Sequence, residues 1–257
     1  MKVVILCGGK GTRIRDVSED LPKPMIPIGE FPILWHIMNI YGSRGFDEFV
    51  LCLGYQGWHI KQYFLDYRLQ VSDVTVSLGD TRPPRFEGAT KLPAWTVTLA
   101  ETGVEAMTGC RLKRVERYLE NATFMLTYGD GVGNVNINKL LAFHRSHGKL
   151  ATVTSVRPVS RFGELTVEGN RVTAFQEKPQ TSAGLINGGF LVCEPGVMGY
   201  VSEDESCSFE QESLRRLARD GQLMTYIHEG FWQPMDTSRE YQLLNHLWAT
   251  GEAPWTK

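Results

Sequence analysis

Short, continuous apolar runs alternate along this chain with segments of helical spacing, and this alternation constrains the fold more than any other feature. A continuous apolar run fits a strand that is covered on both faces, because a strand with one wet face alternates apolar and polar residues. Strands that alternate with helices form α/β folds. The expected strands are Val3–Cys7, Glu48–Leu53, Val74–Leu78, Trp95–Ala100, Ala122–Thr127, Leu150–Val156 and Gly189–Val192, and the expected helices are Ile33–Tyr41, Trp58–Leu69, Cys110–Leu119, Ile137–His144, Glu210–Ala218 and Glu240–Trp248. We therefore expect an open, mixed but mainly parallel sheet with helices on both faces.

Two segments depart from this alternation. Between Arg161 and Phe175, short alternating runs flank the turn-forming residues 168–170, so we expect a small β-hairpin beside the main sheet. The segment Thr81–Pro93 carries three prolines and has neither period. We expect it to form a mobile loop or an arm that reaches a neighbouring subunit.

Composition excludes several classes of protein. The 257 residues, 42% of them hydrophobic, can bury one sizeable core. With 27 Lys and Arg residues against 29 Asp and Glu residues, the net charge of −2 provides no general cationic surface for nucleic acid. The five cysteines include no C-x-x-C pair, which argues against a disulfide framework or a thiolate zinc site. No apolar run approaches a membrane-spanning length, so we expect a cytoplasmic protein without membrane or nucleic-acid partners.

A glycine-rich loop follows the first expected strand directly. It reads Gly8-Gly9-Lys10-Gly11-Thr12-Arg13, and Lys23 follows between two prolines. Glycines let backbone N–H groups approach an anion closely, and the carboxyl end of a strand is where an open α/β sheet binds its ligand. The sequence therefore predicts a phosphate cradle, with an ordinary turn whose charges face solvent as the alternative.

Two better-known phosphate loops do not fit. The Walker loop requires a glycine followed by Lys and then Ser or Thr, and the chain has no such tripeptide. The dinucleotide-binding loop requires a third glycine where Ile14 stands, and the helix that should follow is blocked by Pro22, Pro24 and Pro27. A dehydrogenase is therefore a weak alternative.

Two aspartates are candidate metal ligands. Asp130 follows the expected strand that ends at Thr127, and Asp236 lies in the aromatic segment Phe231–Asp236. Mg²⁺ prefers oxygen ligands and is held by one or two carboxylates together with substrate phosphates. Taken singly, either aspartate could instead be a turn or capping residue.

A third group of polar residues follows the expected hairpin. Glu177, Lys178 and Pro179 form an E-K-P triplet, and Asn187 precedes two glycines. On its own, an adjacent Glu and Lys usually form a solvated surface pair.

The order of strand, G-G-x-G-T-R and then K-P resembles the signature loop of the sugar-1-phosphate nucleotidyltransferases. The resemblance implies that Arg13, Lys23, Asp130 and Asp236 are catalytic, that Asp130 and Asp236 hold Mg²⁺, and that a sugar phosphate lies against the E-K-P segment. The nucleotide-binding residues that it implies are Leu6, Cys7, Gly8, Gly9, Lys10, Gly11, Thr12, Arg13, Lys23, Thr102, Gly103, Gly109, Arg111, Gly129 and Asp130. The implied sugar-phosphate-binding residues are Gly163, Glu177, Lys178, Asn187 and Trp232.

The resemblance covers nearly the whole chain. Phrases such as G-Y-Q-G-W-H-I-K and M-T-G-C-R-L-K-R-V are closest to family members that use CTP and glucose 1-phosphate. It implies a single domain, 1–257, with a nucleotide-binding core at about 1–155, a sugar-phosphate-binding part at about 156–236 and a C-terminal helical segment at about 237–257. The segment Thr81–Pro93 and the aromatic C-terminus, rather than the resemblance, indicate a homo-oligomer. Another nucleotide or sugar, or a non-catalytic sensing subunit on the same fold, are the alternatives.

Other candidate residues are assigned structural roles. His144 and His147 have no third ligand beside them, and we expect both to face solvent on an ordinary helix. Cys7 is expected to pack in the core rather than act as a nucleophile.

Overall fold

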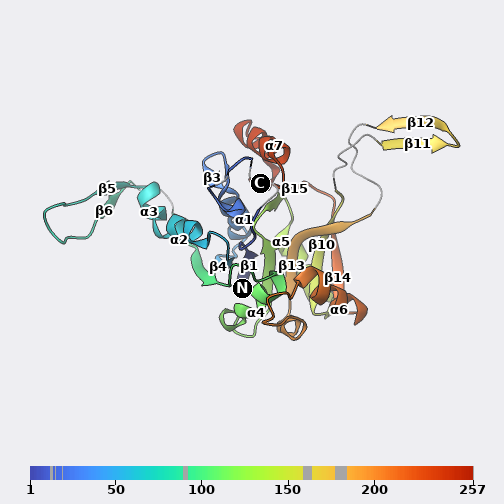
Figure 1. Ribbon diagram of the computed structural model, residues 1–257, viewed down its shortest axis with the longest axis horizontal. Helices are drawn as coiled ribbons and strands as arrows, with labels where there is room; N and C mark the ends of the chain where they lie inside the picture. The colour runs from blue at the N-terminus through green and yellow to red at the C-terminus, as the bar shows by residue number, and fades with distance from the viewer. Residues whose placement is uncertain are drawn as a thin grey trace.

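A seven-stranded sheet forms the centre of the molecule (Figure 1). The computed structural model describes residues 1–11, 14, 16–18, 20–88, 92–158, 164–176 and 184–256. The sheet runs in the order β14-β10-β13-β8-β1-β4-β7. Its strands are β1 (Lys2–Leu6), β4 (Glu48–Leu53), β7 (Thr96–Glu101), β8 (Phe124–Tyr128), β10 (Ala151–Val156), β13 (Ile186–Cys193) and β14 (Leu223–His228).

The expected fold class is confirmed. β1 pairs in parallel with β4 and β8, β4 pairs in parallel with β7, and β10 pairs in parallel with β14. Only β13 runs against its neighbours in this sheet, β10 and β8. The sheet is therefore mixed but mainly parallel. β14 was missed because it is a half-exposed edge strand, and its residues do not form the continuous apolar run of a strand buried on both faces.

Two hydrophobic cores, one on each face, explain the continuous apolar runs. Val3 and Ile5 belong to one core, whereas Val4 and Leu6, which point the other way, belong to the second. The first core includes the buried faces of α1 (Ile33–Gly42) and α5 (Ile137–His147), and the second includes residues of α4 (Thr108–Arg114) and α6 (Leu214–Arg219).

The remaining elements are short or lie at the periphery. α2 (Gly57–Leu65) and α3 (Tyr67–Gln70) replace the single expected helix 58–69, and η3 (Glu116–Tyr118) follows α4 within the expected helix 110–119. A π-helical turn, η5 (Phe209–Ser213), leads into α6. The others are α7 (Ser238–Ala249), η2 (Lys23–Met25), η4 (Pro195–Tyr200), η6 (Pro254–Thr256), and the paired short strands β2 (Pro27–Ile28) with β3 (Phe31–Pro32) and β9 (Gly131–Gly133) with β15 (Trp232–Pro234). None of the described helices is both long and apolar enough to cross a bilayer.

The segment Val74–Leu78 does not join the main sheet, so that expectation was wrong. Instead β5 (Asp73–Thr75) pairs with β6 (Arg85–Glu87) to form an arm that extends beyond α3 and away from the sheet (Figure 1). Arg68 lies over the Phe86 ring of this arm at 4.4 Å, but Val76 is 55% and Leu78 97% exposed. The segment Val74–Leu78 therefore favours extended structure, but it lies outside both hydrophobic cores.

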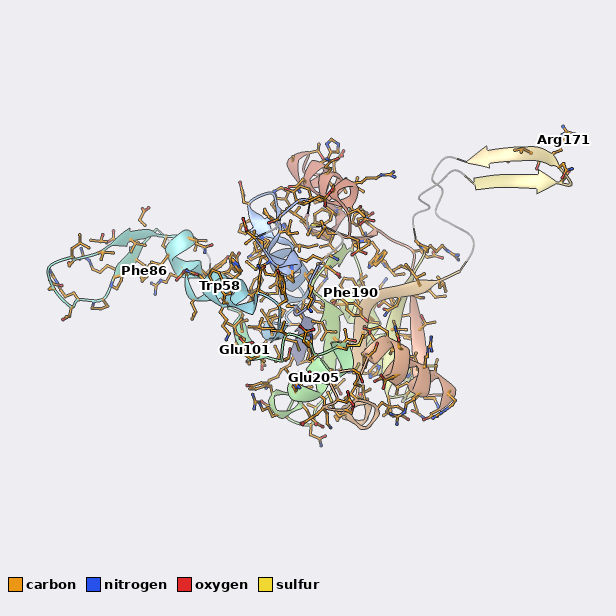
Figure 2. The ribbon with its side chains drawn as sticks, in the orientation of Figure 1. Trp58, Phe86, Glu101, Arg171, Phe190 and Glu205 are labelled. Atoms are coloured by element: carbon orange, nitrogen blue, oxygen red, sulfur yellow. The ribbon has the colours of Figure 1, made fainter. Side chains whose placement is uncertain are left out.

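The expected hairpin is present but lies apart from the sheet. β11 (Glu164–Glu168) pairs antiparallel with β12 (Arg171–Gln176) and with no strand of the main sheet. Figure 2 shows Arg171 at the hairpin's tip on the opposite side of the molecule from Phe86 of the arm.

His144 is buried, contrary to the expectation that it faces solvent. Its Nδ1 lies 2.8 Å from Thr152 Oγ1 and its Nε2 lies 3.1 Å from Glu194 Oε1. The Glu194 carboxylate only accepts, so His144 Nε2 carries a hydrogen and His144 Nδ1 is left as the acceptor. His147 Nδ1 accepts from the Lys149 N–H, so its Nε2 donates to Thr152. The Thr152 hydroxyl then donates to His144, and His144 donates to Glu194. The pair thus links α5 to the sheet.

Candidate active site

The glycine loop and Asp130 come together because β1 and β8 are parallel neighbours. Their carboxyl ends meet at the same edge of the sheet, and Gly129 N donates to Leu6 O at 3.1 Å. A Cβ atom at Gly129 would lie 3.1 Å from both Leu6 O and Pro24 Cγ, which is tighter than a side chain readily accepts. Glycine at this position therefore lets Asp130 approach the loop.

Asp236 reaches the same place through a small sheet. β15 pairs with β9 so that Pro234 lies opposite Gly131, and Met235 N donates to Asp130 O at 2.8 Å. The backbone of Asp236 is fixed from the other side, since its N–H donates to the Glu240 carboxylate in the first turn of α7 at 2.7 Å. Two carboxylates from distant segments thus lie side by side.

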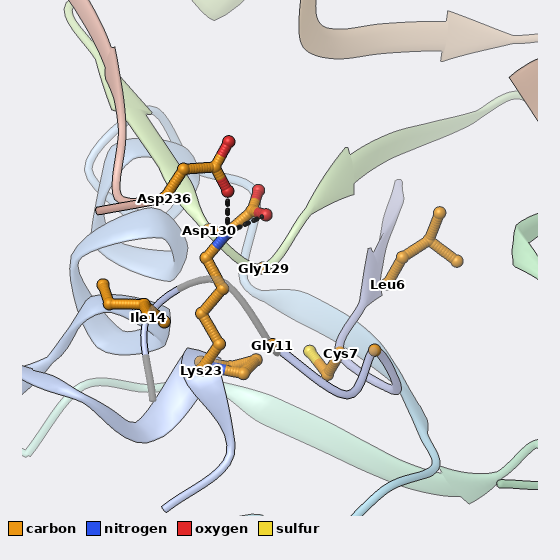
Figure 3. Close-up of a pocket in the computed structure, with 10 residues that line it drawn as sticks. Leu6, Cys7, Gly11, Ile14, Lys23, Gly129, Asp130 and Asp236 are labelled. Atoms are coloured by element: carbon orange, nitrogen blue, oxygen red, sulfur yellow. Dashed lines mark hydrogen bonds and ion pairs between the residues drawn. The ribbon is translucent and has the colours of Figure 1, made fainter. Parts of the chain in front are cut away.

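Lys23 lies between these carboxylates. Its Nζ donates to Asp130 Oδ2 at 2.7 Å and also to Asp236 Oδ1 (Figure 3). The Lys23 side chain is only 11% exposed. Burial by itself lowers the pKa of Lys23, but the two aspartates outweigh burial and the net pKa is raised above its ordinary value. The ammonium group is therefore charged, and it neutralises part of the acidic pair.

A pocket of about 220 Å³ opens beside this cluster. It is lined by Leu6, Cys7, Gly9, Gly11, Ile14, Lys23, Pro24, Gly129, Asp130 and Asp236 (Figure 3). Among the described residues, no three His, Cys, Asp or Glu side chains gather closely enough to hold a metal by themselves. Two carboxylates that converge on one cation nevertheless fit Mg²⁺, which takes one or two carboxylates and completes its coordination with phosphate and water.

The glycine loop is placed as expected at the pocket, although not all of it is described. Gly9 and Gly11 line the pocket, whereas Lys10 turns to Glu105, with 2.9 Å between Nζ and the carboxylate. Thr12 and Arg13 lie outside the described residues.

Four of the expected nucleotide-binding residues, Thr102, Gly103, Gly109 and Arg111, are not among the residues that line the pocket. Arg111 is buried, and its terminal nitrogens donate to Leu53 O at 3.0 Å, Thr102 Oγ1 at 2.9 Å, Gly103 O at 2.7 Å and Gly8 O at 3.0 Å. Burial lowers the pKa of Arg111. Gly109 packs against Cys207, to whose carbonyl its N–H donates at 2.9 Å. Contact of these four residues with the nucleotide stays a prediction.

The expected sugar side forms a separate recess. Thr127, Tyr128, Asp130, Gly131, Asn187, Gly188, Gly189, Trp232 and Pro234 line it, and Trp232 Nε1 donates to Gly188 O at 2.7 Å. Asp130 therefore lies in both this recess and the phosphate pocket. Gly163, Glu177 and Lys178 lie outside the described residues.

A larger hollow of about 470 Å³ adjoins both spaces and was not expected. It shares Asp236 with the phosphate pocket and Trp232 with the recess, and it adds Arg239 from the first turn of α7. Two of the residues that line this hollow, Thr237 and Glu240, form the capping box of α7. Their T-x-x-E spacing is visible in the sequence, but it predicts the start of a helix rather than a binding space.

Comparison with known proteins identifies a family. Residues 2–242 match the family described as nucleotidyl transferase. A glucose-1-phosphate cytidylyltransferase of Salmonella typhi is 46% identical over 256 residues, which cover 99% of this chain and 98% of the relative. A probable glucose-1-phosphate cytidylyltransferase of Bacillus subtilis is 45% identical and covers 99% of both chains.

Solved structures agree on the fold. A putative glucose-1-phosphate thymidylyltransferase from Bacillus anthracis, crystallised with sucrose, superposes with a TM-score of 0.68 at 16% identity and covers 96% of this chain and 94% of its own. A UDP-glucose pyrophosphorylase in complex with UDP-glucose superposes with a TM-score of 0.66 at 14% identity and covers 97% and 98%.

Proposed function

This chain belongs to the nucleotidyl transferase family, and on that premise we propose that it transfers the cytidylyl group of CTP to α-D-glucose 1-phosphate. The products are CDP-glucose, an activated sugar for deoxysugar, O-antigen or polysaccharide synthesis, and pyrophosphate. One structural observation supports this reaction above all: the Lys23–Asp130–Asp236 cluster lies where the phosphate pocket meets the recess lined by Asn187 and Trp232. Two phosphorylated substrates that bind in these two spaces would bring their phosphates together at that cluster.

The reaction needs positioning and charge more than proton transfer. The sugar phosphate attacks the α-phosphorus of CTP in line, and pyrophosphate leaves. The second pKa of a phosphate monoester is about 6, so the nucleophile is already anionic at neutral pH. Lys23, at the edge of the phosphate pocket, stabilises the negative charge that the transition state spreads over phosphoryl oxygens.

We assign Asp130 and Asp236 as the residues that hold Mg²⁺. The ion that these residues would hold would neutralise negative charge on the nucleotide phosphates. In the free protein, the Lys23 ammonium provides that neutralisation to the two carboxylates. Arg13, which the family resemblance places at the nucleotide phosphates, completes the proposed catalytic set.

The sugar is proposed to lie against the Trp232 ring, with Asn187 as a polar contact. An aromatic face together with a few polar groups is a common way to bind a pyranose. The ring is held in place, because Trp232 Nε1 donates to Gly188 O. Glu177 and Lys178 are proposed, from the resemblance alone, to bind the sugar hydroxyls and the sugar phosphate.

We also propose that the protein is a homo-oligomer and that the arm is part of the contact. Exposed large apolar side chains are concentrated on the arm and its supporting helices, where Trp58 is 57%, Leu65 77% and Leu78 97% exposed. Monomeric proteins rarely expose apolar side chains in such a group.

The reaction is tested with purified protein, Mg²⁺, each nucleoside triphosphate in turn and a panel of sugar 1-phosphates, with pyrophosphate release as the readout. We expect release with CTP and glucose 1-phosphate. Release with UTP or dTTP but not CTP would overturn the base assignment while leaving the reaction class intact. Binding of CDP-glucose without turnover of any pair would favour the sensing subunit instead.

A further inference from the structure

A chain of hydrogen bonds leads from the π-helical turn η5 to the sugar-side recess. Glu210, in that turn, accepts from the Tyr128 hydroxyl at 2.7 Å through Oε1. Its other oxygen, Oε2, accepts from Thr108 Oγ1 at 2.6 Å and from Ser208 Oγ at 3.1 Å. The carboxylate is thus held by α4 and η5 and presents one oxygen to β8. π-helical turns occur frequently at functional sites.

The direction of each bond in this chain is determined by the groups themselves. A carboxylate only accepts, so the Tyr128 hydroxyl must donate its proton to Glu210. The Tyr128 oxygen is then left to accept, and it accepts from Asn187 Nδ2 at 3.2 Å.

Both ends of the Asn187 amide are fixed as a result. Its Oδ1 accepts from Gly189 N at 2.8 Å, and its Nδ2 donates to Tyr128. The two contacts exclude the flipped amide, because flipping would place N–H groups against the Gly189 N–H. The second hydrogen on Nδ2 has no acceptor among the described residues, and Asn187 is exposed at the recess. The amide therefore presents a donor of fixed identity.

The Tyr128 ring packs against an irregularity in strand β13. In the β10–β13 pair the register skips from Val153 opposite Leu191 to Ser155 opposite Asn187, which places a bulge at the two glycines that follow Asn187. Gly189 has a φ of +82°, and a Cβ atom there would lie 2.7 Å from Tyr128 Cδ2. The Tyr128 ring therefore lies directly against the bulged backbone.

We propose that Glu210 and Tyr128 are positioning residues for the sugar phosphate: they orient the Asn187 amide so that its remaining N–H donates to an oxygen of a hexose 1-phosphate. This inference rests on the proposed function and deepens it, because it names residues that select the sugar. Neither Glu210 nor Tyr128 needs to touch the substrate. Both act through Asn187.

Steady-state kinetics with Tyr128→Phe test the proposal, since this change keeps the ring against Gly189 and removes only the hydroxyl. We expect the KM for glucose 1-phosphate to rise by about tenfold, the worth of one such hydrogen bond, while the KM for CTP and the melting temperature stay unchanged. Glu210→Ala, which removes both acceptor oxygens, should change the same KM in the same direction. As the matched control, Tyr200→Phe removes a tyrosine hydroxyl that donates to the Asp220 carboxylate at 3.2 Å, outside the residues that line the site, and should leave both KM values as they are.

A double-mutant cycle separates positioning from general structural support. If Tyr128 acts through Asn187, Tyr128→Phe should have no further effect on the sugar KM in an Asn187→Ala background. Additive effects, or a loss confined to the melting temperature or to the KM for CTP, would overturn the proposal.

Calorimetric titration with CDP-glucose repeats the comparison without turnover. An unmodified protein that releases no pyrophosphate contradicts the proposed function, whereas an active protein whose Tyr128→Phe and Glu210→Ala variants bind and turn over normally contradicts only this inference. If one of these two variants does not fold, the kinetics and titration of the other variant test the inference.

Discussion

Lys23 donates to the Asp130 carboxylate across 2.7 Å, although 107 positions separate the two residues in the chain. The contact joins η2, which begins at Lys23, to the loop that follows β8, and the Asp236 carboxylate meets the same ammonium. This ion cluster lies at the edge of the phosphate pocket and is where the proposed chemistry takes place.

Replacing Lys23 with Met should lower kcat by on the order of 10²–10³-fold, because one preorganised donor at the developing charge is lost. Steady-state pyrophosphate release measures the effect. Lys61→Met is the matched control, since the Lys61 ammonium pairs with Glu101 outside the residues that line the pocket and should affect kcat little. Equal losses in the two variants would contradict the assigned role of Lys23.

Asp130→Asn should reduce turnover far more than stability. Charge stabilisation by a bound metal is worth several kcal/mol, and each 1.36 kcal/mol is tenfold in rate, so we expect a loss of roughly 100-fold or more. The rate is measured across a Mg²⁺ titration, with Asp204→Asn, a surface aspartate, as the control. An unchanged rate at saturating Mg²⁺ would show that Asp130 does not hold the metal, and chelation with EDTA should abolish release in the unmodified protein.

Gly8→Ala and Gly9→Ala should differ sharply in stability. A Cβ atom at Gly8 would lie 2.0 Å from Arg111 Nη1, and this guanidinium cannot move freely because it donates to several oxygens. A Cβ atom at Gly9 meets nothing within 4 Å. We expect Gly8→Ala to lower the free energy of unfolding by about 1–3 kcal/mol and Gly9→Ala to change it little. Urea unfolding measures both, and similar values would contradict the role of Arg111 as a buried support.

Acid should weaken the attachment of the C-terminal turn η6 through His36. This residue is buried, its Nε2 lies 2.9 Å from Ile28 O, and its Nδ1 accepts from Trp255 Nε1 at 3.3 Å. Burial lowers the pKa of His36 below its ordinary value, which two backbone hydrogen bonds offset only in part. The unfolded state therefore binds the proton first, so the contribution of His36 is complete above about pH 6.5 and is lost as the pH falls below that value.

Urea unfolding at a series of pH values between 7.5 and 5 measures this effect, with the fluorescence of the chain's six tryptophans as the signal. Part of the decline should disappear in His36→Gln. The lowered pKa of His147, mainly from burial, acts in the same direction and provides a second, independent contribution. A stability that rises on acidification would contradict the assignment for both histidines.

Charge placed on the arm should reduce the oligomer. Leu78→Glu together with Leu65→Glu puts carboxylates at two of the most exposed apolar positions, and burial of an unpaired charge opposes association. Light scattering after size-exclusion chromatography measures the mass. Ile227→Glu, at a 52% exposed position on the edge strand β14, is the control and should leave the mass unchanged. An unchanged mass in the arm variant would exclude the arm from the contact.

Local patterns in the sequence were sufficient for the sheet and for the phosphate loop. The run Glu48–Leu53 is a strand with those bounds because both faces of the central sheet are covered, so every residue after Glu48 is apolar and buried. The loop after β1 was recognisable because close approach of the backbone to an anion requires glycines, and these are adjacent in the chain. The hairpin 164–176 was recognisable from its turn residues.

Contacts between distant segments were decided only by the tertiary structure. Pairing of β9 with β15 places Asp236 beside Asp130, and no local pattern encodes that register. The same limit explains why Val74–Leu78 was expected in the sheet, why His144 was expected at the surface, and why Tyr128 and Glu210 were not recognised as a pair. Periodicity reports which residues favour burial or extended structure, whereas the partner that covers a segment or accepts its hydrogen bond is set by the packing of the whole chain.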